Sequence, residues 1–263
     1  MKNGKFVSLA KFQLTKEEIS GLPSEYASLL ALLCYTINEI NIYSHLFLAT
    51  TKKKPLNPHI KAKWEIQQNS ITRTLNAKIF EALKGITDYR RKLQKNCRTN
   101  ERVLNILSAH LDQLQSLRDR QGYSIAAFFR NKTSNHLIPS MAAEFLPFLS
   151  DTASRTMYLH ELSGESFYPF GEDVMFHAAL DYYANKNDMP PKDVFREWLV
   201  WTGEASNAVV DVFNAIGVHM IEEVFPTKTA QEVEPFVEKD FVDGYNKRPL
   251  ALFANEIQGK RTS

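Results

Sequence analysis

Apolar side chains recur at steps of three and four residues along most of the chain, and this is the periodicity of amphipathic helices. The clearest case follows Pro23, where Ser24 is a suitable N-cap and the pattern predicts a helix that ends near Ala49. The apolar positions of this helix are Leu29, Leu30, Leu33, Ile37, Ile40, Tyr43 and Phe47. The stretch from Lys52 to Pro58 is basic and interrupted by prolines, which predicts a loop before the next helix.

The same periodicity predicts helices over much of the remaining chain. A second long helix is expected from about Lys61 to Gln94, and a third from about Asn100 to Gly122, since glycine commonly ends a helix. Two more helices are predicted from Asp173 to Asn185 and from Lys192 to about Phe225. A last short helix is expected from Thr229 towards Val242.

Two segments depart from the helical pattern. Residues 1–23 are expected to form a lightly structured N-terminal arm. Residues 155–170 carry aromatic and β-branched side chains on both sides of a turn that contains Gly164, which indicates a small β-hairpin. We therefore predict an all-α fold, a bundle of long antiparallel helices with a small β-hairpin insertion. Residues 24–150 form a helical domain with a basic surface, and residues 151–263 add the hairpin and C-terminal helices, packed on the same bundle.

Composition and cysteine usage narrow the class of protein. The 263 residues are 44% hydrophobic and 24% charged, which is typical of a soluble globular protein. Cys34 and Cys97 show neither a disulfide framework nor zinc-ligand spacing, so we expect a cytoplasmic protein. From Tyr26 to Thr50 the only acidic or basic side chains are Glu39 and His45, and the run is long enough to span a bilayer. Polar residues at its centre favour a buried helix instead, and we expect no membrane contact.

The charge of the chain is divided unevenly. Residues 1–150 carry 22 Lys and Arg against 11 Asp and Glu, a net charge of +11, whereas residues 151–263 carry 10 against 19, a net charge of −9. The segment from Arg73 to Arg102 alone holds nine basic and three acidic residues. A basic half suits a polyanionic partner such as RNA, and a solvated basic face without any ligand is an equal alternative.

One short polar stretch carries the residues best suited to chemistry. Arg130, Asn131, Lys132 and His136 follow the apolar run Ile125 to Phe129, and residues 130–136 are termed the Arg/His cassette below. Arginine can neutralise charge on a phosphate, and histidine can transfer protons near neutral pH. Arg130 and His136 would lie about 120° apart on one straight helix. Either the helix ends inside the cassette or, as we favour, a two-fold partner completes the site.

Other chemistries find little support in the sequence. His160 and His177 lie near Glu161, Glu172 and Asp173, but no pair has the spacing of a metal site, so a structural role is favoured. The sequence contains no glycine-rich phosphate loop and no nucleophile elbow. We therefore expect no metal and no cofactor.

The Arg/His cassette, in its helical context, resembles the Arg-polar-x(3–5)-His motif of the HEPN superfamily of α-helical and often dimeric domains. Many of these domains are metal-independent ribonucleases. The stretch from Leu75 to Glu81 is similar to the helix that places an acidic residue beside this motif in related bacterial proteins. The resemblance covers about residues 24–140. Ser134 and Asn135 stand where many relatives of this type carry an aromatic residue before the histidine.

The resemblance implies a role for each cassette residue. His136 would transfer protons, and Arg130 would bind the scissile phosphate and stabilise the transition state. Asn131 would orient His136 or the phosphate, and Glu81 would pair with Arg130 or His136 and fix its position. Lys132 would add affinity for phosphate. Further candidates for contacts with the RNA are Lys78, Arg73, Arg90 and Arg91.

The expected protein is thus a HEPN-like helical bundle that cleaves single-stranded RNA without metal and leaves a 2′,3′-cyclic phosphate. It is expected to act as a homodimer in phage defence or in a toxin–antitoxin system, with an antitoxin or defence protein as a further partner. One alternative is a non-catalytic module that binds RNA, a nucleotide or another protein. A third is a structural dimer in which Arg130 and His136 only cap a helix.

Overall fold

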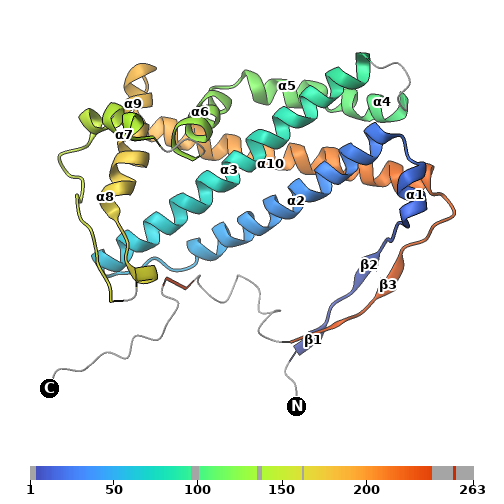
Figure 1. Ribbon diagram of the computed structural model, residues 1–263, viewed down its shortest axis with the longest axis horizontal. Coiled ribbons are helices and arrows are strands. Elements are labelled where there is room, and N and C mark those ends of the chain that lie inside the picture. The colour runs from blue at the N-terminus through green and yellow to red at the C-terminus, as the bar shows by residue number, and fades with distance from the viewer. Residues whose placement is uncertain (1–3, 96–100, 135–137, 162, 239–250, 253–263) are drawn as a thin grey trace.

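The computed structural model describes residues 4–95, 101–134, 138–161, 163–238 and 251–252. It confirms the all-α fold. Three long helices form the frame, namely α2 (Ser24–Thr51), α3 (Pro58–Lys95) and α10 (Pro191–His219). Helices α2 and α3 run side by side, and α10 packs against both of them (Figure 1). None of the described helices is long and apolar enough to cross a membrane.

The turn between α2 and α3 is fixed by an indole hydrogen bond. The Trp64 Nε1 donates to the backbone carbonyl of Thr50 at 2.7 Å. This bond satisfies one of the carbonyls that a helix leaves without a partner at its C-terminal end. Ser24, the expected N-cap of α2, is instead its first helical residue, and Pro23 occupies the cap position. Proline needs no N–H partner, so it is well tolerated at this end of a helix.

The hydrophobic core is one continuous cluster that includes side chains from Tyr26 on α2 to Ile216 on α10. Trp198 and Trp201 of α10 are its largest buried side chains. Gly122 lies directly against Trp201, and a Cβ atom at this glycine would come within 2.3 Å of the Trp201 Cβ. Gly122 therefore allows close packing of α6 on α10. The expectation that Gly122 ends a helix is wrong, because it is the second residue of α6.

The helix expected from Asn100 to Gly122 is divided into two. Helix α4 (Glu101–Ala109) and helix α5 (Leu111–Asp119) meet at His110, and Arg120 is extended before α6 (Gln121–Phe129) begins. The indole of Trp201 donates to the Leu117 carbonyl at 2.8 Å and so fixes the end of α5 to α10. Neither a glycine nor a proline marks the break at His110 in the sequence.

The short elements between α6 and α10 lie at one end of the long helices (Figure 1). After α6 come a π-helical turn η1 (Arg130–Ser134), α7 (Pro139–Phe145) and a 3₁₀ turn η2 (Leu146–Phe148). The expected hairpin is present as one antiparallel bridge, in which Tyr158 and Phe167 exchange hydrogen bonds of 2.9 and 3.0 Å. The remaining elements are η3 (Ser163–Glu165), α8 (Pro169–Glu172), η4 (Asp173–Ala178), α9 (Ala179–Lys186) and, after α10, η5 (Met220–Val224).

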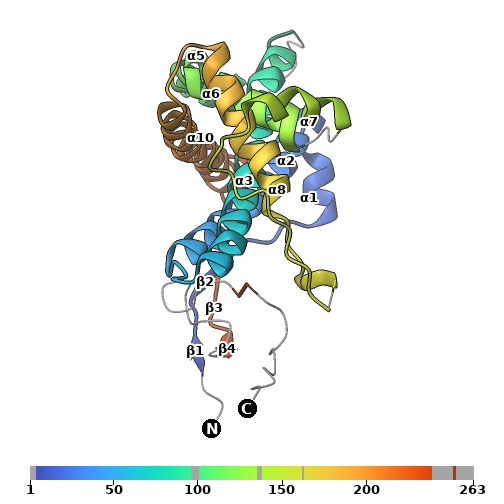
Figure 2. The same cartoon turned by 90° about the vertical axis from the view of Figure 1, so that its left-hand side faces the viewer.

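A two-stranded ribbon extends away from the helices (Figures 1 and 2). Strand β1 (Gly4–Phe6) pairs with β4 (Phe236–Glu238), and β2 (Leu9–Lys11) pairs with β3 (Gln231–Val233), both antiparallel. The expected helix from Thr229 towards Val242 is therefore wrong over its described part, because Pro235 cannot continue a helix and the flanking residues alternate. The N-terminal arm is more ordered than expected, since it also contains α1 (Lys16–Gly21).

Candidate functional site

Two neighbouring phenylalanines fix the end of α6, from which the Arg/His cassette follows. Phe129 is buried, and its ring centroid lies 4.8 Å from that of Trp198 and 5.4 Å from that of Phe176. Phe128 points to other aromatic side chains and lies 5.0 Å from Tyr183. Aromatic pairs at such distances add to the stabilisation from burial. The backbone that carries Arg130 is thus held by the core on two sides.

The cassette begins with a change of helical geometry. Residues Arg130–Ser134 form the π-helical turn η1, in which hydrogen bonds span five residues instead of four. The buried Thr133 hydroxyl donates to the Phe129 carbonyl at 3.0 Å. Ile138 is extended and is followed at once by α7. Residues 135–137 lie outside the described part of the chain, so the point at which the helix ends is not described and both sequence-based alternatives stay predictions.

Arg130 and Glu81 are brought together, as the resemblance implied. The Arg130 Nη2 lies 2.5 Å from the Glu81 Oε1, and the Arg130 Nη1 donates to the Asn131 Oδ1 at 2.7 Å. The two side chains of the ion pair are 26% and 44% exposed, so solvent reaches both of them. The Arg130 Nε is buried without a hydrogen-bond partner. The guanidinium is therefore oriented from α3 on one side and from its own turn on the other.

Lys132 faces a different neighbour. Its Nζ lies 3.7 Å from the Glu144 Oε2 on α7, and the hydroxyl of Tyr182 donates to the other oxygen of the same carboxylate. The Glu144 carboxylate raises the pKa of Tyr182, because it accepts the hydrogen bond of the phenol and repels the phenolate. The two cations of the cassette thus contact different elements, since Arg130 contacts α3 and Lys132 contacts α7.

Two other predicted RNA-binding residues, Arg73 and Lys78, form ion pairs with glutamates outside the cassette. Arg73 forms two hydrogen bonds with Glu172, of 2.6 and 3.1 Å, and its guanidinium lies 5.1 Å from the Phe176 ring centroid. The Lys78 Nζ lies 2.8 Å from the Glu39 Oε1 on α2, and this hydrogen bond raises the pKa of Lys78. Each of these cations is already paired with a carboxylate.

Three predicted residues lie in or beside segments outside the described part of the chain. His136 lies outside the described residues, so its distances to Arg130, Asn131 and Glu81 are not defined. The Arg91 side chain also lies outside the described part of the chain. Arg90 is half-buried near the end of α3, and its Nε is buried without a hydrogen-bond partner.

The sequence reasoning missed the acidic residues that pair with the basic ones. Glu172 contacts Arg73, Glu39 contacts Lys78, and Glu144 lies beside Lys132. The members of each pair are at least 12 positions apart, and Arg73 and Glu172 are separated by 99 positions. A local motif or a helical spacing therefore could not have indicated these contacts.

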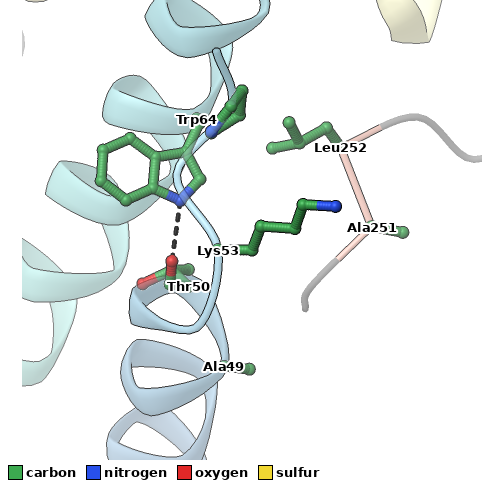
Figure 3. Close-up of a pocket in the computed structure, with 7 residues that line it drawn as sticks. Ala49, Thr50, Lys53, Trp64, Ala251 and Leu252 are labelled. Atoms are coloured by element: carbon green, nitrogen blue, oxygen red, sulfur yellow. Dashed lines mark hydrogen bonds between the residues drawn. The ribbon is translucent and has the colours of Figure 1, made fainter. Parts of the chain in front are cut away.

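A pocket of about 320 Å³ lies away from the cassette, where α2 turns into α3 (Figure 3). Its lining residues are Ala49, Thr50, Lys53, Pro55, Trp64, Ala251 and Leu252. Figure 3 shows the Lys53 side chain directed towards the segment that contains Ala251 and Leu252. None of the described cassette residues, 130–134, lines this pocket. Among the described residues, no three His, Cys, Asp or Glu side chains gather as metal ligands would.

Comparisons with known proteins do not assign the chain to a family: no family model, no curated protein and no solved structure matches it.

Proposed function

We propose that this chain is a cytoplasmic, metal-independent endoribonuclease of HEPN type that cleaves single-stranded RNA. The observation that carries the proposal is the ion pair between Glu81 on α3 and Arg130 at the start of the cassette. The proposed protein is a homodimer that acts in phage defence or with an antitoxin. Its chemistry uses the 2′-hydroxyl of the RNA as nucleophile and leaves a 2′,3′-cyclic phosphate.

The orientation of Arg130 supports this role. Glu81 and Asn131 engage one terminal nitrogen each, and an arginine carries five N–H donors, so further donors remain for phosphate oxygens. A guanidinium held in place before the reaction stabilises developing charge better than a mobile one. Under this proposal His136 transfers the proton, Arg130 stabilises the transition state, and Glu81 and Asn131 position Arg130.

The carboxylate partners of the basic residues favour a second candidate. Arg73, Lys78 and Lys132 each lie within 4 Å of a glutamate oxygen, so their charges attract a polyanion less than free cations would. The second candidate is a non-catalytic module that binds a protein partner or RNA through the same helical surface.

Cleavage of a labelled single-stranded RNA in EDTA separates the two candidates. We expect the wild-type chain to cleave it with cyclic-phosphate ends, and His136→Ala to cleave at least about 100-fold more slowly, as for the loss of a general acid–base. His177→Ala, which changes an exposed histidine on η4, is the matched control and should cleave normally. Absence of cleavage by the wild-type chain, with RNA binding unchanged in His136→Ala, would favour the module.

A further inference from the structure

A short segment from the last part of the sequence lies against the first turns of α3. Residues 251–252 line the pocket at the turn between α2 and α3, and the Gln67 Nε2 donates a hydrogen bond to the Ala251 carbonyl at 3.2 Å. These two residues are 184 positions apart in the chain. The Leu252 side chain is half-buried and points towards the turn that carries Trp64 (Figure 3). The segment is therefore held through its main chain and through a side chain.

The Leu252 side chain lies between two hollows. One is the pocket of about 320 Å³ shown in Figure 3. The other has a volume of about 630 Å³ and is lined by α2, α3 and residues between Ser166 and Glu172. Leu252 is the residue that lines both of them. The two hollows are thus parts of one trough along the start of α3, and a segment of the same chain is seated in it.

The wall of the trough suits an uncharged, apolar occupant. The charged side chains of the larger hollow are paired within the chain, since the Lys63 Nζ lies 2.9 Å from the Glu165 Oε2 and the Glu172 carboxylate accepts two hydrogen bonds from Arg73. Apolar side chains gain free energy when they are buried in such a place, whereas an unpaired charge loses it. The apolar residues of the larger hollow include Leu46, Ile66, Ile71 and Phe167.

The sequence around Leu252 has the matching composition. Residues 249–255, with the sequence Pro-Leu-Ala-Leu-Phe-Ala-Asn, carry no charge. Residues 239–248 before them carry five charged side chains, and residues 256–263 after them carry three. The segment seated in the trough is therefore the uncharged, apolar part of an otherwise charged stretch.

The Gln67 side chain indicates that the ligand of the trough is a peptide main chain. Its Oε1 is buried and has no hydrogen-bond partner among the described residues. A primary amide both donates and accepts, so Gln67 can accept an N–H of the same extended chain whose Ala251 carbonyl it already binds. A buried acceptor without a partner costs free energy, which favours an occupant that supplies an N–H. In the recognition of extended peptides, main-chain hydrogen bonds give affinity and side-chain pockets give specificity.

We propose that the trough is a recognition site for an extended, uncharged peptide segment, and that its occupant is this chain's own segment around Ala251 and Leu252. Gln67 binds the main chain of the segment, and the apolar wall binds the Leu252 side chain. Leu252 does not belong to the hydrophobic core cluster, so the segment can leave the trough while the helices stay folded. A segment of the same chain competes at a high effective concentration and closes the site to free peptides. The inference does not rest on cleavage of RNA.

The first test measures binding of a fluorescently labelled peptide with the sequence of residues 246–256 to the full-length chain, by anisotropy. We expect Leu252→Asp to bind the peptide at least about tenfold more tightly than the wild type, because its own charged segment no longer competes for the trough. Leu56→Asp, at a fully exposed leucine of the nearby loop, should bind the peptide as weakly as the wild type. Circular dichroism of each variant establishes that it folds.

Two neighbouring glutamines test the recognition itself. In the Leu252→Asp background, Gln67→Ala should weaken binding of the peptide about fivefold, as for the loss of one hydrogen bond. Gln68→Ala removes a side chain that lines neither hollow and should leave binding unchanged. Absence of binding to both the wild type and Leu252→Asp would overturn the proposal. So would equal binding to these two chains, or equal effects of the two glutamine substitutions.

The second test follows the segment within its own chain by limited proteolysis with chymotrypsin, which cleaves after leucine and phenylalanine. A docked segment is cleaved only when it leaves its site, so Gln67→Ala should accelerate cleavage after Leu252 about fivefold and Gln68→Ala should not. Mass spectrometry assigns the cleavage sites, and cleavage after the exposed Phe6 of the ribbon is the internal standard. Equal rates after Leu252 in the wild type and in Gln67→Ala would contradict the proposal. Neither result affects the proposed ribonuclease, which the RNA-cleavage assay tests separately.

Discussion

Two arginine–glutamate pairs connect α3 to elements that follow it in the chain, and they differ in burial. In the first, Arg73 forms two hydrogen bonds with Glu172 of α8, and the two side chains are only 16% and 10% exposed. In the second, Glu81 meets Arg130 of η1 through one contact of 2.5 Å, and both side chains reach solvent. The same residue types thus serve in one buried and one open pair.

The comparison shows why residue type alone does not identify a functional arginine. From the sequence, both Arg73 and Arg130 are predicted to contact RNA, and Arg130 is also predicted to stabilise the transition state. In the folded chain, the guanidinium of Arg73 contacts the Glu172 carboxylate and the ring of Phe176. The main effect of Arg73 is therefore to hold α8 on α3. Arg130 retains donors and solvent access, which suits a ligand. The buried pair should therefore affect stability, and the open pair should affect activity.

Breaking the buried pair should have the largest effect on stability. We expect Arg73→Ala to lower the free energy of unfolding by about 3 kcal/mol, because it leaves the Glu172 carboxylate buried without its partner. Urea unfolding followed by circular dichroism measures this change.

The double variant Arg73→Met with Glu172→Leu is the control for this prediction. Replacing both charges by apolar side chains of similar size should restore most of the lost stability, since neither charge then remains unpaired. If Arg73→Ala changes the free energy of unfolding by less than about 1 kcal/mol, the pair behaves as a surface pair and the contrast with Arg130 is lost.

Breaking the open pair should have a smaller effect on stability and a separate effect on activity. We expect Glu81→Gln to lower the free energy of unfolding by no more than about 1 kcal/mol, as for exposed ion pairs. If Glu81 positions Arg130, the same variant should lower kcat for RNA cleavage with little change in KM. Glu65→Gln, which breaks the exposed pair of Glu65 with Lys61 on the same helix, should change neither.

Strong periodicity explains the part of the fold that was predictable. The helix expected from Ser24 to Ala49 is observed at Ser24–Thr51, and the one expected from Lys61 to Gln94 at Pro58–Lys95. Their apolar stripes extend over many turns, so the pattern outweighs any single residue. The break between α4 and α5 at His110 was missed because it depends on packing against α10, for which the local sequence carries no signal.

Contacts between distant segments explain what was not predictable. The ribbon joins residues 4–11 to residues 231–238, and its three-residue strands are too short to show a clear alternation. At the candidate site, the Arg/His motif indicated Arg130, and the similarity of the stretch from Leu75 to Glu81 to a known helix indicated Glu81. The partners of Arg73 and Lys132 depend on how α8 and α7 pack against α3 and η1, and that is decided by the tertiary structure.

The smallest effect in this series concerns Asp181 on α9, a half-buried carboxyl that lacks the guanidinium partner of Glu172. Burial raises the pKa of Asp181, and nearby His177 opposes this shift only in part. A carboxyl with a raised pKa in the folded state favours folding when protonated, so its contribution is lost as the pH rises through that pKa. We therefore expect Asp181→Asn to stabilise the chain at pH 7 by less than about 1 kcal/mol, allowing for solvent screening. The gain should disappear at pH 3, where the wild-type carboxyl is protonated as well.

Urea unfolding at the two pH values measures the difference, and Asn185→Ala, one turn further along α9, controls for the substitution itself. An equal gain at both pH values would show that the carboxylate charge is not its cause.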